Sequence, residues 1–365
     1  ARQGVQPNIE CGDNRTIHRE EIKMANKRRE DWIDCLKCIA ILIVMMNHLG
    51  LTIPGFSFWG GMFFVPIFFL LSGYTYHTKE ETFGRFLKRK AKRLLLPYIT
   101  ANAILFVFFF VKESLLGSIS AAEELKILYG IFYARNQLLS WDVLTLFLPQ
   151  MNQNVYLMTI LNSPTWFLMA LFLTIIAFEI LIRVTDKNGR RMWFVAGLFL
   201  LLAVLYRYLF PVLLPWSLDA VPFFLLFFMT GYFIRRKAII YYLDQHKITL
   251  VLLLGLLIVC GVWNGSANFS IASYGKSIIL ALYNAAASSI LAMYAGFKLK
   301  KHIWKGFALV GRQTLVLMCY HMFLFAILET VWPGIPKLFE LLLVLVLLTA
   351  AGYGKEKFYA KKQGG

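Results

Sequence analysis

Charged residues are scarce in this chain, and acidic residues are especially few. Of its 365 residues 16% are charged, whereas soluble domains average about a quarter, and 38 lysines and arginines oppose only 20 aspartates and glutamates. Hydrophobic residues make up 59% of the sequence, and the mean hydropathy is +0.62. This composition argues against an ordinary soluble domain and favours a helical protein that crosses a membrane several times.

Cysteine is also sparse. The five cysteines are Cys11, Cys35, Cys38, Cys260 and Cys319, and at least three of them lie in or beside apolar segments. No loop predicted to lie outside carries a pair, which argues against a disulfide framework. The spacing of Cys35 and Cys38 matches the CxxC pattern, but no second pair of ligands accompanies it. We therefore expect no metal ion and no redox chemistry there.

The sequence also lacks a low-complexity linker, an internal repeat and an additional soluble domain. We therefore expect one transmembrane domain over residues 32–356, between a polar segment at 1–31 and a short tail at 357–365. The first of these segments is mixed in charge and contains no apolar stretch of the signal-peptide type. Both flanking segments are expected in the cytoplasm.

Apolar segments of membrane-spanning length recur along the whole chain. They predict an all-α bundle of about ten transmembrane helices. The predicted spans cover residues 33–54, 57–77, 94–111, 164–183, 192–210, 218–234, 248–263, 277–297, 306–327 and 338–354. The connection at 113–163 contains SWDVLTLFLPQM and NVYLMTIL, which are too short to span. These two stretches are expected either to roof a cavity as interfacial or re-entrant helices or to pack over the bundle.

Basic residues alternate between the predicted loops. They gather before the first span and after the second, fourth, sixth, eighth and tenth, whereas the other loops are poor in lysine and arginine. This alternation follows the positive-inside rule with both termini in the cytoplasm. Topology and contact with anionic lipid thus account for the net charge of +18, and no nucleic-acid partner is expected.

The first predicted span carries three polar residues near one face. Lys37 and His48 are three helical turns plus about 20° apart, so they share a face and lie about 16 Å apart along the axis. Asp34 lies close to the same face. Such side chains are costly in lipid and belong in a protein interior or a wet cavity.

Two interpretations are open for His48, and two for Lys37. His48 is a candidate general base or acyl carrier, and the alternative is a histidine that only bonds a neighbouring helix. Lys37 either holds a phosphate or polarises a carbonyl, or it reaches out to the lipid headgroups.

A basic stripe follows the second predicted span. Arg85, Lys88, Arg89, Lys92 and Arg93 fall at i, i+3, i+4, i+7 and i+8, which is one helical face. Guanidinium groups bind phosphate in a forked geometry, so the stripe is a candidate site for a cytoplasmic ligand with several phosphates. The alternative is topogenic charge that rests on anionic lipid.

Further polar and aromatic residues lie in later segments. Trp166 opens the fourth span and either anchors it at the interface or lines an acceptor site. Tyr320 and His321 lie inside the ninth span, and either structure or substrate binding explains them. The segment 72–74, Ser-Gly-Tyr, is expected to permit close helix packing.

Two weaker features complete the set. Arg207 and Asp219 flank the turn between the fifth and sixth spans and either pair with each other or contact a polar acceptor. Asn264 and Asn268 begin tripeptides that match glycosylation sequons, which occur readily by chance.

Taken together, these segments resemble the integral-membrane acyltransferase 3 family. The resemblance covers about residues 32–330 and is closest to the bacterial sugar O-acetyltransferase branch, such as the fucose 4-O-acetylase-like proteins. The segments that carry it, in order, are D-x-L-K-x(10)-H, PIFFLLSGYTY, F-x-K-R-K-x(2)-R-L-L-L-P-Y, PTWFLMALFL, FFMTGYFIRR and GRQTLVLMCYHMFLF.

The resemblance implies a function and assigns residues to it. An acyl group, usually acetyl from cytoplasmic acetyl-CoA, would pass to a hydroxyl of an envelope carbohydrate or glycolipid at the outer side of the bacterial cytoplasmic (inner) membrane. His48 matches the family's essential histidine, and Lys37 matches a position that many members fill with arginine. Arg85, Arg89 and Arg93 match the basic motif expected near the CoA phosphates. Association into a homo-oligomer is compatible with this assignment.

Functions of two other classes fit parts of the pattern. A polytopic transporter or flippase of a lipid-linked or small polar substrate would share the span count and the buried charges. It would move its substrate without consuming acetyl-CoA. A structural or sensor subunit would need neither His48 nor the basic stripe.

Overall fold

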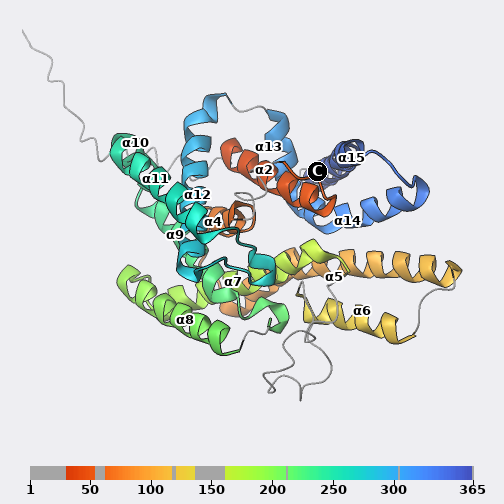
Figure 1. Cartoon of the computed structure of the whole chain (residues 1–365), viewed down its shortest axis with the longest axis horizontal. Helices are drawn as coiled ribbons and strands as arrows, with labels where there is room; N and C mark the ends of the chain where they lie inside the picture. Colours follow the sequence, from red (N-terminus) through yellow and green to blue (C-terminus); the bar gives the residue numbers. More distant parts are fainter. Residues whose placement is uncertain are drawn as a thin grey trace, which may run out of the picture.

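The structure is a computed structural model, and it describes residues 30–53, 62–116, 121–135, 161–210, 213–302 and 305–363. Helices make up the regular structure of these ranges (Figure 1). They are α2 (Asp31–His48), α4 (Pro66–Tyr74), α5 (Phe83–Leu116), α6 (Ala121–Tyr133), α7 (Trp166–Val184), α8 (Gly189–Leu209), α9 (Val221–Arg236), α10 (Ile239–Gln245), α11 (Lys247–Asn264), α12 (Ile278–Lys298), α13 (Lys305–Arg312), α14 (Thr314–Val331) and α15 (Lys337–Gln363). Short 3₁₀ turns include η3 (Ser163–Thr165), η4 (Pro215–Ser217) and η5 (Phe269–Ile271).

Eight helices of the described chain are long and apolar enough to cross a membrane. They are α5, α7, α8, α9, α11, α12, α14 and α15. Large apolar side chains such as Phe194, Val251 and Val346 are exposed on them, as lipid-facing residues are. The protein is therefore a multi-pass, all-helical membrane protein, and the prediction of about ten spans agrees with this class.

The first two predicted spans differ from the other eight. Helix α2 has 18 residues and carries Asp31, Asp34 and Lys37, and it ends at His48 rather than at residue 54. Helix α4 has only nine residues, and residues 54–61 before it lie outside the described ranges. The exact number of spans thus stays a prediction.

Two other predicted boundaries were wrong. The basic run belongs to α5 itself, which starts at Phe83, because no residue between the run and the apolar part breaks the helix, and Pro97 is accommodated within it. The ninth span is divided at Gln313 into α13 and α14. A Cβ on Gly311 of α13 would collide with the backbone carbonyl of Asp34, so α13 crosses α2 at backbone contact.

Helix α4 lies at the centre of the bundle, against α2, α9 and α12 (Figure 1). A Cβ on Gly73 would collide with the Phe228 carbonyl of α9, and one on Gly231 with the Leu70 carbonyl. The packing role predicted for residues 72–74 is therefore confirmed. Stacked aromatic rings extend this contact, since Phe69 and Phe224 lie 4.1 Å apart between ring centroids.

The bundle has two chemically different ends. At the basic end, Arg235 of α9 pairs with Glu30 before α2 (3.5 Å), and Arg183 of α7 donates to the carbonyl of Glu81 before α5 (3.0 Å). At the histidine end lie His48, the last residue of α2, and Trp166, the first of α7. Helices α2 and α7 therefore run between these ends in opposite directions.

Within the predicted connection at 113–163, residues 121–133 form α6. The stretch SWDVLTLFLPQM and nearly all of NVYLMTIL lie outside the described residues, as does most of the polar segment at 1–31.

Candidate active site

A cavity of about 230 Å³ at the histidine end contains His48. We call it the histidine pocket. It is lined by Val44, Asn47, His48, Phe64, Val65, Phe68, Ser163, Pro164, Trp166, Phe167, Asn268, Ser270, Ile271 and Met318. His48 is exposed to this cavity because α2 ends there, so its imidazole can reach a ligand. The bundle therefore holds this histidine in a wet recess, as its cost in lipid requires.

A second imidazole lies beside the first. The ring centroids of His48 and His321 are 5.5 Å apart, and His321 is completely buried. The Nδ1 atom of His321 lies 2.6 Å from the carbonyl oxygen of Leu317 and must donate to it, because a carbonyl only accepts. Nε2 has no hydrogen-bond partner in the described part of the chain. Nε2 is thus available to accept a hydrogen bond next to His48. In catalytic sites, a third group of this kind orients the base.

Several polar residues of the pocket were missed by the sequence analysis. Asn47 precedes His48 and lines the same cavity, and Ser270 and Asn268 line its far wall. The side-chain oxygen of Asn268 accepts from the backbone nitrogen of Ser270 at 3.0 Å and from its hydroxyl at 2.6 Å. The amide groups of Asn47 and Asn268 are therefore the donors available to a developing oxyanion.

Trp166 forms part of the pocket wall and is backed by a buried ion pair. The guanidinium carbon of Arg135 lies 5.4 Å from the indole ring centroid. Arg135 is completely buried and pairs with Asp219 at 2.8 Å and with the Ser217 hydroxyl at 3.2 Å. The ion-pair partner of Asp219 is thus Arg135 and not Arg207, so the first of the two alternatives for Arg207 and Asp219 is not observed. Arg135 lies after α6, in a connection whose position in the bundle the sequence did not indicate.

Lys37, Tyr320 and His321 are not among the described residues that line the histidine pocket, and His321 lies buried behind His48. The ammonium group of Lys37 lies 3.2 Å from the carboxylate of Asp34, which is almost fully buried. The guanidinium group of Arg312 approaches the same carboxylate at 3.7 Å. Tyr320 packs against the apolar core on another face of α14 than His321.

A second cavity, of about 280 Å³, lies at the basic end and is called the basic pocket. Its lining is Ser72, Thr75, Tyr76, His77, Lys79, Phe86, Arg89, Lys90, Arg93, Leu94, Leu171, Ile175 and Phe228. Three of the four lysines and arginines in this lining come from one face of α5, and the fourth, Lys79, precedes the helix. This face includes Arg89 and Arg93 of the predicted stripe, and it adds Lys90. Arg85, Lys88 and Lys92 are exposed and outside the lining.

One cation of this pocket, Arg89, is held by an acidic residue, and a second carboxylate lies beside the pocket. Arg89 forms an ion pair with Glu81, and its hydrogen bond lowers the pKa of the Glu81 carboxyl group. Glu179 accepts from Tyr76 and binds Arg183 at 2.6 Å. An anionic ligand would therefore find a preorganised group of cations, with Glu81 as the competing anion.

The two pockets lie along the same seam between α4 and α7. Phe68 of α4 and Phe167 of α7 line the histidine pocket, and Ser72 and Leu171 line the basic pocket. Each step is four residues, or about 6 Å along a helix. The rings of Phe68 and Phe167 are both buried, with centroids 5.3 Å apart. We therefore interpret this aromatic pair as the partition between the pockets.

Comparison with known proteins gives one match. A family model described as an acyltransferase domain, of the acyltransferase 3 type, matches residues 30–354. No curated protein and no solved structure matches the chain. The matched range contains both pockets and the seam between them.

Proposed function

Because the chain belongs to the acyltransferase 3 family and is thus a membrane acyltransferase, we propose that it transfers an acetyl group from acetyl-CoA to a hydroxyl group of a cell-envelope sugar or glycolipid. One arrangement carries this proposal. A cationic cavity and a histidine cavity lie along one seam, separated by a single aromatic pair. In the proposed orientation the basic end faces the bacterial cytoplasm, in keeping with the positive-inside rule.

The basic pocket is the proposed site of the donor's phosphates. Arg89, Lys90 and Arg93 supply charge-assisted hydrogen bonds to phosphate oxygens. The acylated arm would then follow the seam between α4 and α7 toward His48. Rotation of Phe68 or Phe167 would let the arm pass, since each ring sits at the partition. Lys37 adds positive charge on the helix that leads from the basic end to His48.

The proposed chemistry takes place in the histidine pocket. His48 removes the proton of the acceptor hydroxyl while the hydroxyl oxygen bonds to the thioester carbonyl carbon. Asn47 is the proposed amide donor to the oxyanion that develops. The carbon–sulfur bond then breaks, and the proton on His48 passes to the departing thiolate. His321 holds the His48 ring in position through its free acceptor nitrogen, and Trp166 is proposed to contact the acceptor.

The test is the variant His48→Ala. Loss of the base should lower acetyl transfer by at least about 10²-fold without unfolding the protein. Mass spectrometry of envelope glycans and glycolipids, from cells with the protein, with the variant and with neither, reports both the transferred mass and the acceptor. His246→Ala is the matched control, because His246 is an exposed histidine before α11.

Undiminished acetylation by His48→Ala would contradict the proposal. A transporter or flippase, the alternative from the sequence, would move its substrate without consuming acetyl-CoA. The family match does not support that alternative.

A further inference from the structure

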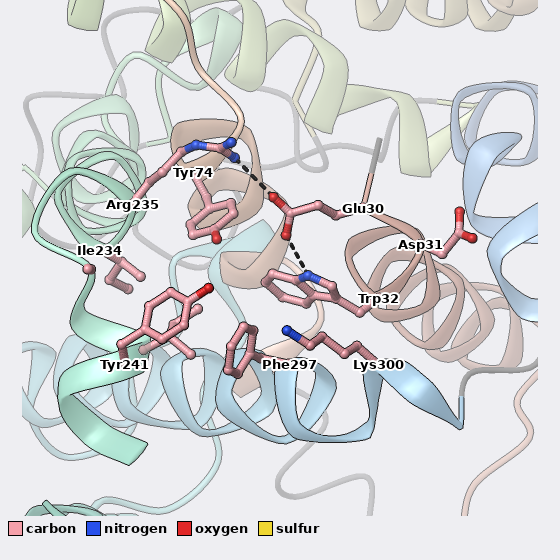
Figure 2. Close-up of a pocket in the computed structure, with 11 residues that line it drawn as sticks. Glu30, Asp31, Trp32, Tyr74, Ile234, Arg235, Tyr241, Phe297 and Lys300 are labelled. Carbon is pink, nitrogen blue, oxygen red and sulfur yellow. Dashed lines mark hydrogen bonds and ion pairs between the residues drawn. The ribbon is translucent and has the colours of Figure 1, made fainter. Parts of the chain in front are cut away.

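A third cavity lies at the basic end and has no part in the mechanism above. Its volume is about 370 Å³, the largest of the three. We call it the aromatic pocket (Figure 2). It is lined by Glu30, Asp31, Trp32, Tyr74, Ile234, Arg235, Ala238, Ile240, Tyr241, Phe297 and Lys300.

Four aromatic rings from four different helices surround this cavity (Figure 2). Trp32 meets Tyr74 edge to face at 5.6 Å between ring centroids, and Tyr241 meets Phe297 in the same way at 5.0 Å. Neighbouring rings therefore stand at steep angles and turn different faces and edges into the space. Such walls suit a flat, π-rich ligand, because an aromatic base can stack on one ring and meet the edge of the next.

Charged groups stand around the aromatic walls. The Arg235 guanidinium lies 5.0 Å from the Tyr74 ring centroid and 3.5 Å from the Glu30 carboxylate. The ammonium of Lys300 lies 4.1 Å from the Phe297 centroid. Glu30 also accepts from the Trp32 indole at 2.6 Å. Two cations suit a phosphate, and the Glu30 carboxylate suits an exocyclic amino group. The Asp31 carboxylate points away from the cavity and pairs with Arg312 at 2.7 Å (Figure 2).

The aromatic pocket adjoins the basic pocket across the end of α4. Tyr74 lines the first cavity, and Thr75, the next residue, lines the second. Arg235 also lies close enough to His77 of the basic pocket for their charges to interact. One extended ligand can therefore occupy both cavities, with phosphates on α5 and an aromatic group beyond α4.

We propose that the aromatic pocket binds the adenine base of the acyl donor, with Arg235 and Lys300 holding the phosphate on its ribose. The inference rests on the proposed function, and it adds a site for the nucleotide end of the acetyl-CoA donor. An acyl phosphopantetheine on a carrier protein has no adenine nucleotide and would leave this pocket empty.

Ligands that contain only one end of acetyl-CoA test the two ends of the donor separately. The full-length protein, in lipid nanodiscs, is titrated with acetyl-CoA, with adenosine 3′,5′-bisphosphate and with S-acetyl phosphopantetheine. Tyr241→Ala should weaken binding of the first two by about 5- to 100-fold, the range for loss of one stacking ring, and leave the third unchanged. Tyr242→Ala is the matched control, because its ring stacks on His246 outside the pocket.

A second variant tests the charged rim. Lys300→Ala should lower the preference for acetyl-CoA over its 3′-dephospho form, because only Arg235 then remains to hold the phosphate. The substitution alters no core residue, because Lys300 is exposed. The affinity of Lys300→Ala for the 3′-dephospho form should equal that of the wild type, and this equality reports that the variant is folded.

The outcomes distinguish this inference from the proposed function. If the wild-type protein binds and consumes acetyl-CoA but Tyr241→Ala binds both adenine ligands as the wild type does, the adenine site is wrong and the function stands. Equal weakening of S-acetyl phosphopantetheine would also overturn the adenine site. If the wild-type protein binds none of the three ligands, the inference and the proposed donor both fail.

Discussion

The two imidazoles at the histidine end act as a pair. His48 is exposed to the cavity, whereas His321 is completely buried and already donates its Nδ1 proton to the Leu317 carbonyl. Only Nε2 of His321 therefore remains to accept a hydrogen bond from His48. Such a bond would leave the other nitrogen of His48 basic and directed at the acceptor. We therefore propose that His321 is a positioning residue for the base.

Substitution of His321 tests this role. His321→Ala removes the acceptor and should lower kcat by about 10²-fold, whereas His321→Gln keeps an acceptor oxygen and should retain part of the rate. The KM for acetyl-CoA should stay the same in both variants, because the basic pocket lies at the other end of the seam. Steady-state kinetics of donor consumption measures the two constants. An equal loss in both variants would indicate a purely structural histidine.

Sequence reasoning reached some of these residues and not others. His48 and Trp166 could be predicted, because an imidazole or an indole in an apolar segment is conspicuous, and the pair of Lys37 with Asp34 follows from helical spacing. Asn47 and Ser270 could not be predicted. A polar residue at a helix end or in a turn has no periodicity, and only the folded chain brings it to a cavity.

At the scale of the helix, the face of α5 decides which cations meet a ligand. Arg93 lines the basic pocket, and its neighbour Lys92 is exposed outside it. Arg93→Gln should therefore raise the KM for acetyl-CoA by about tenfold or more, the cost of one charge-assisted hydrogen bond. Lys92→Gln should change it less than twofold. A similar rise in KM for both variants would contradict this face and support the stripe predicted from the sequence, which contains both residues.

The contact between α4 and α9 makes a second prediction for an element. Gly73→Ala places a methyl group against the Phe228 carbonyl, so α4 must move away from α9. We expect a loss of about 1–3 kcal/mol in stability, as for other overpacked sites. Thermal unfolding in detergent micelles measures it. Gly84→Ala is the control, since a Cβ there meets nothing within 4 Å. An unchanged unfolding temperature for Gly73→Ala would show that the contact is loose.

Length and hydropathy predict the long helices well, and packing explains the exceptions. The eight helices that meet both criteria each coincide with a predicted span, because a run of apolar residues is itself the signal. The shortness of α4 and the break at Gln313 are not visible in such a signal. Both lie where backbones touch, at Gly73 and Gly311. A small residue indicates that close packing is possible, as at residues 72–74, but it does not show which distant segment makes the contact or where the helix ends.

At the scale of the whole molecule, the two ends imply a direction. The basic and aromatic pockets lie at one end and the histidine pocket at the other. In sealed membrane vesicles, acetyl-CoA added outside should be consumed only when the vesicles are inside-out, because CoA does not cross lipid. Right-side-out vesicles should show no consumption until they are permeabilised. Equal consumption by both kinds of vesicle before permeabilisation would contradict the proposed orientation.

The aromatic pair of Phe68 and Phe167 has a consequence for the cell's energy supply. A protein that passes an acetyl group through a bilayer must not let protons and other ions follow, since the ion gradient would then dissipate. The partition is only about one helical turn thick, and it is made of two buried rings in contact. An apolar constriction of this kind excludes water and with it the conduction of ions. In the proposed mechanism, the pair that admits the donor arm would thus also insulate the membrane between turnovers.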